Sequence, residues 1–316
     1  MGFGSFLKLV EIQTKVASVI PLLIGTLYSV YRFGKFDLTN FLIMTASLLS
    51  VDMAITAINN YMDYKKAKKK KGYGYEEHNA IVRDGLDENI VKVVIGLLLF
   101  IASALGILLY TRTDIIVLLL GLASFLVGIF YSCGPIPISR TALGEVFSGF
   151  FMGAIIIFLS SYIHLDKSQI ISMDLSLTKF ALSLNIFDLF GFFLISLPAF
   201  AGISNIMLAN NICDVKDDFE NKRYTLPVHI GVENSIKLFE GIYLLGYLGV
   251  IAGVGFGFDS VISILMLATI KPVMENCKLF AKNPTKKDTF ILAVKNFVLI
   301  NSIHILTLGI GSIFVK

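Results

Sequence analysis

Nine stretches of mostly apolar residues run through this 316-residue chain. They cover roughly residues 14–31, 40–58, 91–110, 114–133, 144–163, 187–209, 236–256, 259–276 and 290–314. A helix needs about 20 such residues to cross a bilayer, and without water its backbone must form hydrogen bonds within the segment. Only 16% of the residues are charged, against about 25% in soluble domains. The sequence therefore predicts one all-α polytopic membrane domain, residues 1–316, with nine spanning helices.

Lysine and arginine are unequally divided between the two sets of connections. With nine helices, 21 of the 27 lie on the side of the N-terminus and 6 on the other. Cytoplasmic loops carry such an excess, so we expect a multi-pass cell-membrane protein with the richer side in the cytoplasm. The run Lys65–Lys71 is interpreted as a topology anchor or a contact for membrane lipid, with a minority of its lysines lining an entrance for an anionic substrate. No nucleic-acid partner is expected for so short a loop.

Two connections on the richer side open with the same polar pattern. Residues 59–63 and 210–214 both read Asn-Asn-x-x-Asp, and four predicted helices separate them. Such self-similarity indicates an internal duplication, with halves at about residues 10–140 and 141–316. A chance match at equivalent positions is the alternative.

The spacing within each motif brings oxygen ligands together. Residues four apart share a helix face, so Asn59 projects with Asp63, and Asn210 projects with Asp214 and Asp218. Two facing carboxylate clusters repel each other unless cations lie between them. Hard oxygen ligands suit Mg²⁺, which commonly bridges to phosphates. We therefore expect these five residues to bind Mg²⁺ at the cytoplasmic surface.

Basic residues accompany both motifs. Arg83 follows the first, and Lys222 and Arg223 follow the second. Arginine forms paired hydrogen bonds with phosphate oxygens, so these three are candidates for binding a diphosphate. The competing interpretation is that the Asn and Asp residues only cap helix ends, where both types are common.

Three further polar side chains are candidates for lining an acceptor cavity. Asp52 lies inside the second apolar segment, and an ionisable group there marks either a functional site or a pair with a neighbouring helix. Tyr131 precedes the helix-breaking run 132–137, and Glu145 opens the next segment. The charge of Glu145 either stabilises the first turn of its helix through the helix dipole, or Glu145 joins Tyr131 in the polar roof of a cavity.

At these residues the chain resembles the UbiA superfamily of intramembrane aromatic prenyltransferases. Residues 59–63 are similar to its first motif, Asn-Asp-x-x-Asp-x-x-x-Asp, with departures at Asn60 and Ala67. Asp214 and Asp218 match its second, Asp-x-x-x-Asp. Residues 222–227, Lys-Arg-Tyr-Thr-Leu-Pro, resemble the Lys-Arg-x-Thr-Leu-Pro continuation.

The resemblance implies nine helices and Mg²⁺-dependent transfer of a polyprenyl group from its diphosphate to an aromatic ring. Asp63, Asp214, Asp218 and Arg83 would then be catalytic residues. The tract 131–137 with Glu145 resembles the branch that prenylates 1,4-dihydroxy-2-naphthoate in menaquinone biosynthesis. Pro135 stands where the 4-hydroxybenzoate branch usually has lysine. Another aromatic acceptor, such as 4-hydroxybenzoate, is the alternative within the family.

Two interpretations from other classes compete with an enzyme. A transporter would also have many helices, a repeat and an intramembrane acid. However, a repeat of four helices gives both halves the same orientation, unlike the inverted repeats of many secondary transporters. A non-catalytic isoprenoid-binding scaffold is the third alternative, and it would not need paired acids.

Overall fold

The structure is a computed structural model that describes residues 1–66, 79–175, 178 and 180–314. Lys68–Lys71, which make up most of the lysine run, and Ala67 lie outside the described residues. The predicted roles of that run and of Ala67 therefore stay predictions.

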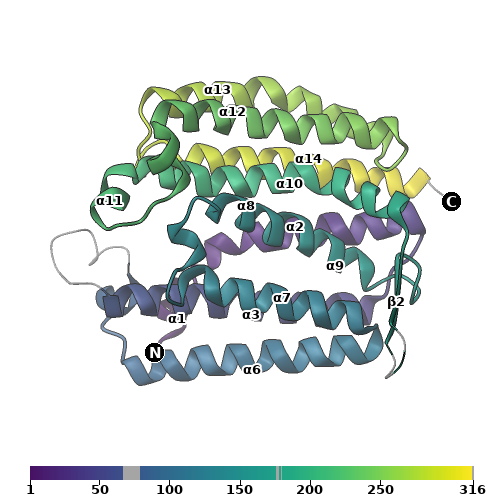
Figure 1. Ribbon diagram of the computed structural model, residues 1–316, viewed down its shortest axis with the longest axis horizontal. Helices are drawn as coiled ribbons and strands as arrows, with labels where there is room; N and C mark the ends of the chain where they lie inside the picture. Colours follow the sequence, from purple (N-terminus) through teal and green to yellow (C-terminus); the bar gives the residue numbers. More distant parts are fainter. Residues whose placement is uncertain (67–78, 176–177, 179, 315–316) are drawn as a thin grey trace.

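The described chain is helical apart from one hairpin (Figure 1). The long helices are α2 (Val16–Tyr28), α3 (Leu38–Lys66), α6 (Glu88–Arg112), α7 (Ile115–Ser132), α10 (Ile186–Cys213), α12 (Leu226–Gly255), α13 (Ile270–Lys282) and α14 (Phe290–Phe314). The short ones are α1 (Phe3–Leu9), α5 (Ala80–Arg83), α8 (Gly144–Ser148), α9 (Ile156–Tyr162) and α11 (Val215–Glu220). Tighter or wider turns form η1 (Ile12–Lys15), η2 (Ser29–Phe33), η3 (Ile138–Arg140), η4 (Gly149–Ile155) and η5 (Val261–Thr269).

Polar side chains fix where several of the spanning helices begin. Asp87 accepts hydrogen bonds from two backbone N–H groups in the first turn of α6, and Asp114 accepts one at the start of α7. Asn185 does the same for α10 through the N–H of Asp188. These caps satisfy donors that the helices cannot pair internally.

Eight of the nine predicted spans are confirmed within the described residues as helices long and apolar enough to cross a membrane. The count of nine is not confirmed, because residues 259–276 do not form one apolar helix. The chain there forms the 3₁₀ helix η5 and then the amphipathic α13. Val273, Cys277 and Phe280 form the buried stripe of α13, while Lys271 and Lys278 lie on its exposed face. The ribbon nevertheless returns alongside α12 (Figure 1).

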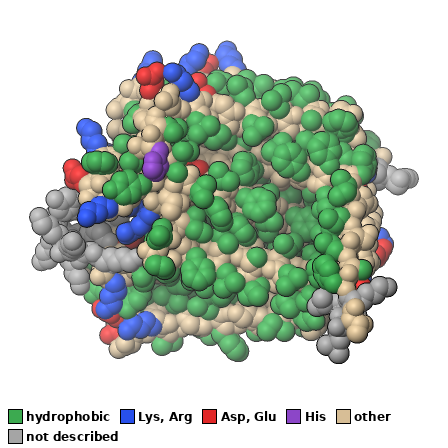
Figure 2. All heavy atoms as spheres, in the orientation of Figure 1, with side chains coloured by type: hydrophobic (Ala, Val, Ile, Leu, Met, Phe, Trp, Pro, Cys, Tyr) green, Lys and Arg blue, Asp and Glu red, His purple; other side chains and the backbone are tan. Residues whose placement is uncertain are grey.

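The helices lie nearly parallel in layers, with α10 and α14 between the α12–α13 pair and the α2–α9 pair (Figure 1). Of the α10 span 67% is buried, against 17% for α6 and 11% for α7. Thus α10 is central, and α6 and α7 present broad apolar faces. Figure 2 shows a mostly hydrophobic side, with charged side chains gathered mainly at the end that carries α11. Such a distribution fits a bundle surrounded by lipid.

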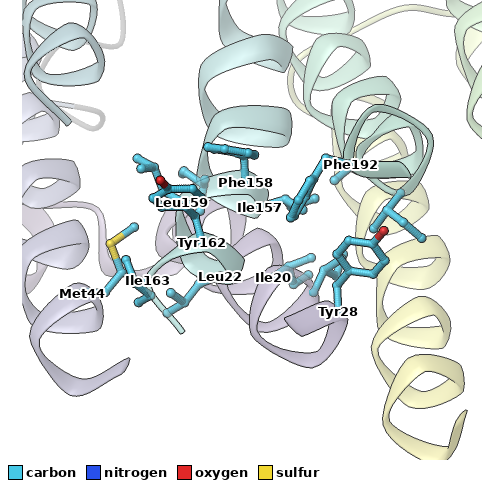
Figure 3. Close-up of a cluster of buried hydrophobic side chains, with 14 of the residues drawn as sticks. Ile20, Leu22, Tyr28, Met44, Ile157, Phe158, Leu159, Tyr162, Ile163 and Phe192 are labelled. Atoms are coloured by element: carbon cyan, nitrogen blue, oxygen red, sulfur yellow. The ribbon is translucent and has the colours of Figure 1, made fainter. Parts of the chain in front are cut away.

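The largest buried cluster joins α2, α9 and α10. Ile20, Leu22 and Tyr28 of α2 face Ile157 and other side chains of α9 (Figure 3). The ring of Phe192, from α10, packs edge-on against that of Tyr28 at 5.1 Å. The cluster fixes the first spanning helix against the central one.

A β-hairpin that the sequence analysis missed lies between α9 and α10, at the end opposite α11 (Figure 1). Its strands are β1 (Ile171–Leu175) and β2 (Phe180–Leu184), and they pair antiparallel with Ile171 opposite Leu184. The first strand, Ile-Ser-Met-Asp-Leu, alternates strictly between apolar and polar residues, and this was the available signal.

Glycines allow two pairs of helices to touch through their backbones. A Cβ on Gly153 of η4 would lie 2.7 Å from the backbone of Phe200 in α10, and one on Gly25 would lie 2.2 Å from the carbonyl oxygen of Ile157. Small residues at such crossings let membrane helices approach closely.

We expect Gly153→Ala to destabilise the fold by about 1–3 kcal/mol, because the added methyl group meets backbone that cannot turn away. Gly121→Ala is the matched control, since nothing lies within 4 Å of its added Cβ and alanine is the better helix former. Thermal unfolding of the purified variants in detergent measures the difference. Equal stability of the two variants would contradict the close contact.

Candidate active site

The first motif lies on the last two turns of α3, at the end of the bundle near α11 (Figure 1). The Oδ1 atom of Asn59 is buried without a hydrogen-bond partner in the described structure. Asp63, one turn further on, is exposed. The helical spacing predicted for these two residues is confirmed, and it leaves an oxygen ligand of Asn59 unused.

Asn60 has a structural role. Its Nδ2 atom donates to the carbonyl oxygen of Leu9 at 2.9 Å and to Oε1 of Glu11 at 3.1 Å. A carboxylate could not donate to either oxygen. The backbone oxygen of Asn60 also accepts from Nδ2 of Asn79 at 2.8 Å. Asparagine at this position therefore ties α3 to the N-terminal segment and to the start of α5.

The second motif spans the junction of α10 and α11. α10 ends at Cys213, and Asp214 caps the next helix. The backbone N–H of Asp214 donates to Asn210 at 3.2 Å, and that of Asp218 donates to Asp214 at 2.8 Å. The spacing of four residues therefore continues across the junction of the two helices. The single continuous helix that the sequence predicted over Asn210–Asp218 is not present.

Both acids of the second motif have basic partners. Nζ of Lys286, from the connection before α14, lies 2.5 Å from Oδ2 of Asp214. Nε of Arg223 lies 3.2 Å from Oδ1 of Asp218, whose side chain is only 3% exposed. Thr225 donates to the other oxygen of Asp218 at 3.1 Å. Burial raises the pKa of Asp218, while Arg223 and Thr225 oppose that rise.

Tyr131 and Glu145, predicted to form the polar roof of a cavity, are neighbours in the structure, while their role in lining a cavity stays a prediction. Nδ2 of Asn211 donates to Oε1 of Glu145 at 2.8 Å, and the hydroxyl of Tyr131 donates to the carbonyl oxygen of Gly144 at 3.4 Å. Glu145 is buried, and its Oε2 atom has no hydrogen-bond partner in the described structure. The second asparagine of motif two thus joins the roof to the acids. Asn210 makes a weak hydrogen bond, in which its Nδ2 atom donates to Oδ1 of Asn211 at 3.5 Å.

The three predicted diphosphate-binding residues point to different partners. Arg83, on α5, places Nε 3.0 Å from Oδ1 of Asp84. Arg223 pairs with Asp218, whereas Lys222 lines a separate pocket. The three cations therefore have different immediate partners, and their joint role in binding a diphosphate stays a prediction.

Asp52 pairs structurally with a neighbouring segment. Nζ of Lys15 lies 2.6 Å from Oδ1 of Asp52 and donates to Thr56 at 2.7 Å, while Ser18 donates to Oδ2 of Asp52. The side chain of Lys15 is 5% exposed and that of Asp52 is 14% exposed. In the sequence, Lys15 is only one of the 21 basic residues on the side of the N-terminus. Its position inside the first apolar segment was the available signal.

The side chains of the two motifs fit a divalent cation only in part. Within the described residues, no three His, Cys, Asp or Glu side chains converge on one point, so the predicted carboxylate cluster is not preassembled. The donors nonetheless suit Mg²⁺, because Asn59 offers an unused oxygen and the two acids of motif two offer carboxylate oxygens. Two residues of the site were not predicted from the sequence. They are Lys286, which pairs with Asp214, and Asn211, which donates to Glu145.

Comparisons with known proteins agree with the resemblance found in the sequence motifs. The profile of the UbiA prenyltransferase family matches residues 18–298. The chain is 29% identical over 308 residues to 1,4-dihydroxy-2-naphthoate octaprenyltransferase of Bacillus subtilis (strain 168), covering 96% of this chain and 90% of that one. It is 25% identical over 237 residues to UbiA prenyltransferase domain-containing protein 1 of Dictyostelium discoideum, covering 73% of this chain and 65% of that one.

Two solved structures share the fold. A UbiA homolog from Aeropyrum pernix K1 superposes with a TM-score of 0.67 at 18% identity, over 93% of this chain and 98% of that one. A UbiA homolog from Archaeoglobus fulgidus, bound to DMAPP and Mg²⁺, gives 0.64 at 14% identity, over 99% and 100% of the two chains.

We expect Lys15→Met to destabilise the protein by about 3–5 kcal/mol, because it leaves the charge of Asp52 without a partner inside the membrane. The double variant Lys15→Met/Asp52→Leu removes both charges and should recover most of the loss. Unfolding in mixed detergent measures both. The control is Lys35→Met, which breaks an exposed 3.0 Å pair with Asp166 and should cost at most about 1 kcal/mol. A single variant as stable as wild type would contradict the structural role.

Proposed function

The chain belongs to the UbiA prenyltransferase family, and we propose that, with Mg²⁺, it transfers a polyprenyl group from polyprenyl diphosphate to 1,4-dihydroxy-2-naphthoate. Loss of CO₂ and diphosphate would give demethylmenaquinol, a step of menaquinone biosynthesis. Membership makes the chain a multi-pass membrane enzyme that transfers prenyl groups, so the transporter alternative is set aside. The observation that carries the acceptor is the 29% identity to the Bacillus subtilis enzyme over 96% of this chain.

The metal site is proposed at the two motifs. Asn59 and Asp63 from α3, with Asn210, Asp214 and Asp218 from the α10–α11 junction, would hold Mg²⁺. The support is chemical, since these side chains offer hard oxygen donors, and a homologue of the same fold binds DMAPP and Mg²⁺. When bound, Mg²⁺ would act as a Lewis acid on the diphosphate leaving group.

Lys286 and Arg223 are the cations that a metal–diphosphate complex would meet at Asp214 and Asp218. They now neutralise the two acids. If those acids bound the metal, both cations would be available to the diphosphate oxygens, with Arg83 as a further candidate. The residues of this chain thus bind and orient the leaving group.

Carbon–carbon bond formation follows cleavage of the allylic C–O bond. The resulting allyl cation needs a pocket that excludes water, and the electron-rich ring attacks it at carbon. The roof of Tyr131, Glu145 and Asn211 lies next to the second motif through its hydrogen bonds. We assign Tyr131 and Glu145 to positioning the acceptor, with the unpartnered Oε2 of Glu145 able to accept from a ring hydroxyl. Asp52 is assigned to the support of α2 on α3.

The motif end of the bundle is proposed to face the cytoplasm of a cell membrane. The support is the division of 21 against 6 basic residues and the gathering of charged side chains at that end (Figure 2). Polyprenyl tails would then extend along the helices into lipid.

Turnover in membranes tests the acceptor. We expect a prenylated, decarboxylated naphthoquinol when polyprenyl diphosphate, Mg²⁺ and 1,4-dihydroxy-2-naphthoate are supplied, and no product with EDTA. Mass spectrometry identifies the product. Turnover with 4-hydroxybenzoate alone would keep the enzyme class and reject the proposed acceptor.

We expect Asp63→Asn and Asp214→Asn each to lower kcat by on the order of 100-fold or more, because each removes a charge that the metal–diphosphate complex needs. Asp166→Asn at the opposite end, an exposed acid, is the control and should keep full activity. Membrane insertion is checked by expression level and by elution in detergent. Near-normal turnover in both motif variants would reject the metal site.

A further inference from the structure

A basic pocket separate from the paired acids opens at the α11 end of the bundle. Its volume is about 350 Å³, and it lies between the connection after α7 and the α11–α12 linker. Pro135, Ile136 and Arg140 line one side, and Lys222, Tyr224 and His229 line the other.

Backbone geometry holds the two sides together and separates the neighbours Lys222 and Arg223. The N–H of Tyr224 donates to the carbonyl oxygen of Arg140 at 3.1 Å, so the two connections are joined directly. Lys222 has a φ of 54°, in the left-handed region that few residues other than glycine adopt. Lys222 therefore lines the pocket, while Arg223 pairs with Asp218.

Within the described residues, no acid in the lining balances the charge of the pocket. Its lining, as far as the structure describes the chain, contains neither Asp nor Glu. Neither Arg140 nor Lys222 forms an ion pair in the part of the chain that the structure describes. By contrast, Lys15, Arg223 and Lys286 each lie beside an acid. Two uncompensated cations with a histidine beside them match a dianion better than a single carboxylate, and a guanidinium binds phosphate oxygens in pairs.

The rim of the pocket is apolar. Ile136 is 76% exposed and Tyr224 is 49% exposed, at the end of the spanning helices. Aromatic rings with a polar tip favour the boundary between lipid and water, and basic pockets at that boundary bind lipid head groups. A ligand with both a phosphate and a hydrocarbon chain satisfies the cations and the rim together.

We propose that this pocket binds the phosphate group of an anionic lipid at the membrane surface, independently of divalent metal. Two lipids carry that chemistry here. One is an acidic phospholipid of the surrounding bilayer, and the other is the polyprenyl diphosphate substrate on its way to the metal site. The second source rests on the proposed function, whereas the first does not.

The experiment counts ligands on the purified full-length protein by native mass spectrometry in EDTA. The probes are phosphatidate, phosphatidylcholine with the same acyl chains, and geranyl diphosphate. We expect wild type to retain phosphatidate, geranyl diphosphate or both more tightly than phosphatidylcholine. Arg140→Gln/Lys222→Gln should weaken that binding by roughly fivefold for each cation removed. Arg140→Lys keeps the charge and should retain most of it.

The matched control is Lys278→Gln/Lys282→Gln, which removes two exposed cations from α13 and should bind as wild type. Loss confined to phosphatidate identifies the bilayer lipid, and loss confined to geranyl diphosphate identifies the substrate. Unchanged binding of both probes by folded Arg140→Gln and by the double variant overturns the proposal, as does an equal loss in the control. Mg²⁺-dependent binding of geranyl diphosphate, measured separately, reports on the proposed catalytic site, so failure of one does not imply failure of the other.

Discussion

The absence of water from the bilayer core is the constraint on which the rest of this structure depends. Every polar group within the spans must find its partner in the protein. Lys15 therefore lies against Asp52 with Ser18 and Thr56 around the pair. Further along the bundle, Glu145 receives the amide of Asn211. Two polar atoms near the motifs, Oδ1 of Asn59 and Oε2 of Glu145, have no partner within the described residues and are therefore the places where we expect a ligand.

Much of this arrangement could be predicted from the pattern of residues. Long apolar segments identified eight spanning helices, because their length and lack of charge leave the backbone no other solution in lipid. The segment 259–276 was harder to predict, since hydropathy averages over a 3₁₀ turn and the charged face of α13. The helical spacing of the motif residues, four apart, could also be predicted. The break of the helix at Asp214 could not, because hydrogen bonds of the same spacing continue across it.

The partners of the site residues were less accessible to sequence reasoning. Lys286 lies far along the chain from Asp214, and only the packing of the C-terminal helices brings them within 2.5 Å. Lys222 and Arg223 are adjacent and similar, so a sequence gives no reason to separate them. The left-handed backbone of Lys222 does so. Asn60 reads as an acid lost from a motif, yet its amide is needed for two contacts with the N-terminal segment. Tertiary structure decides each of these roles.

The ion pair between Lys286 and Asp214 also bears on how easily a ligand can reach this acid. Lys286 lies in the short connection between α13 and α14, whereas Asp214 follows the last residue of the central helix α10. The lysine side chain is 55% exposed, and exposed pairs of this kind are worth at most about 1 kcal/mol. The packing of α13 and α14 on α10 rests instead on a buried apolar cluster. Water or a ligand can therefore replace the ammonium group at Asp214 without disturbing the helices around it.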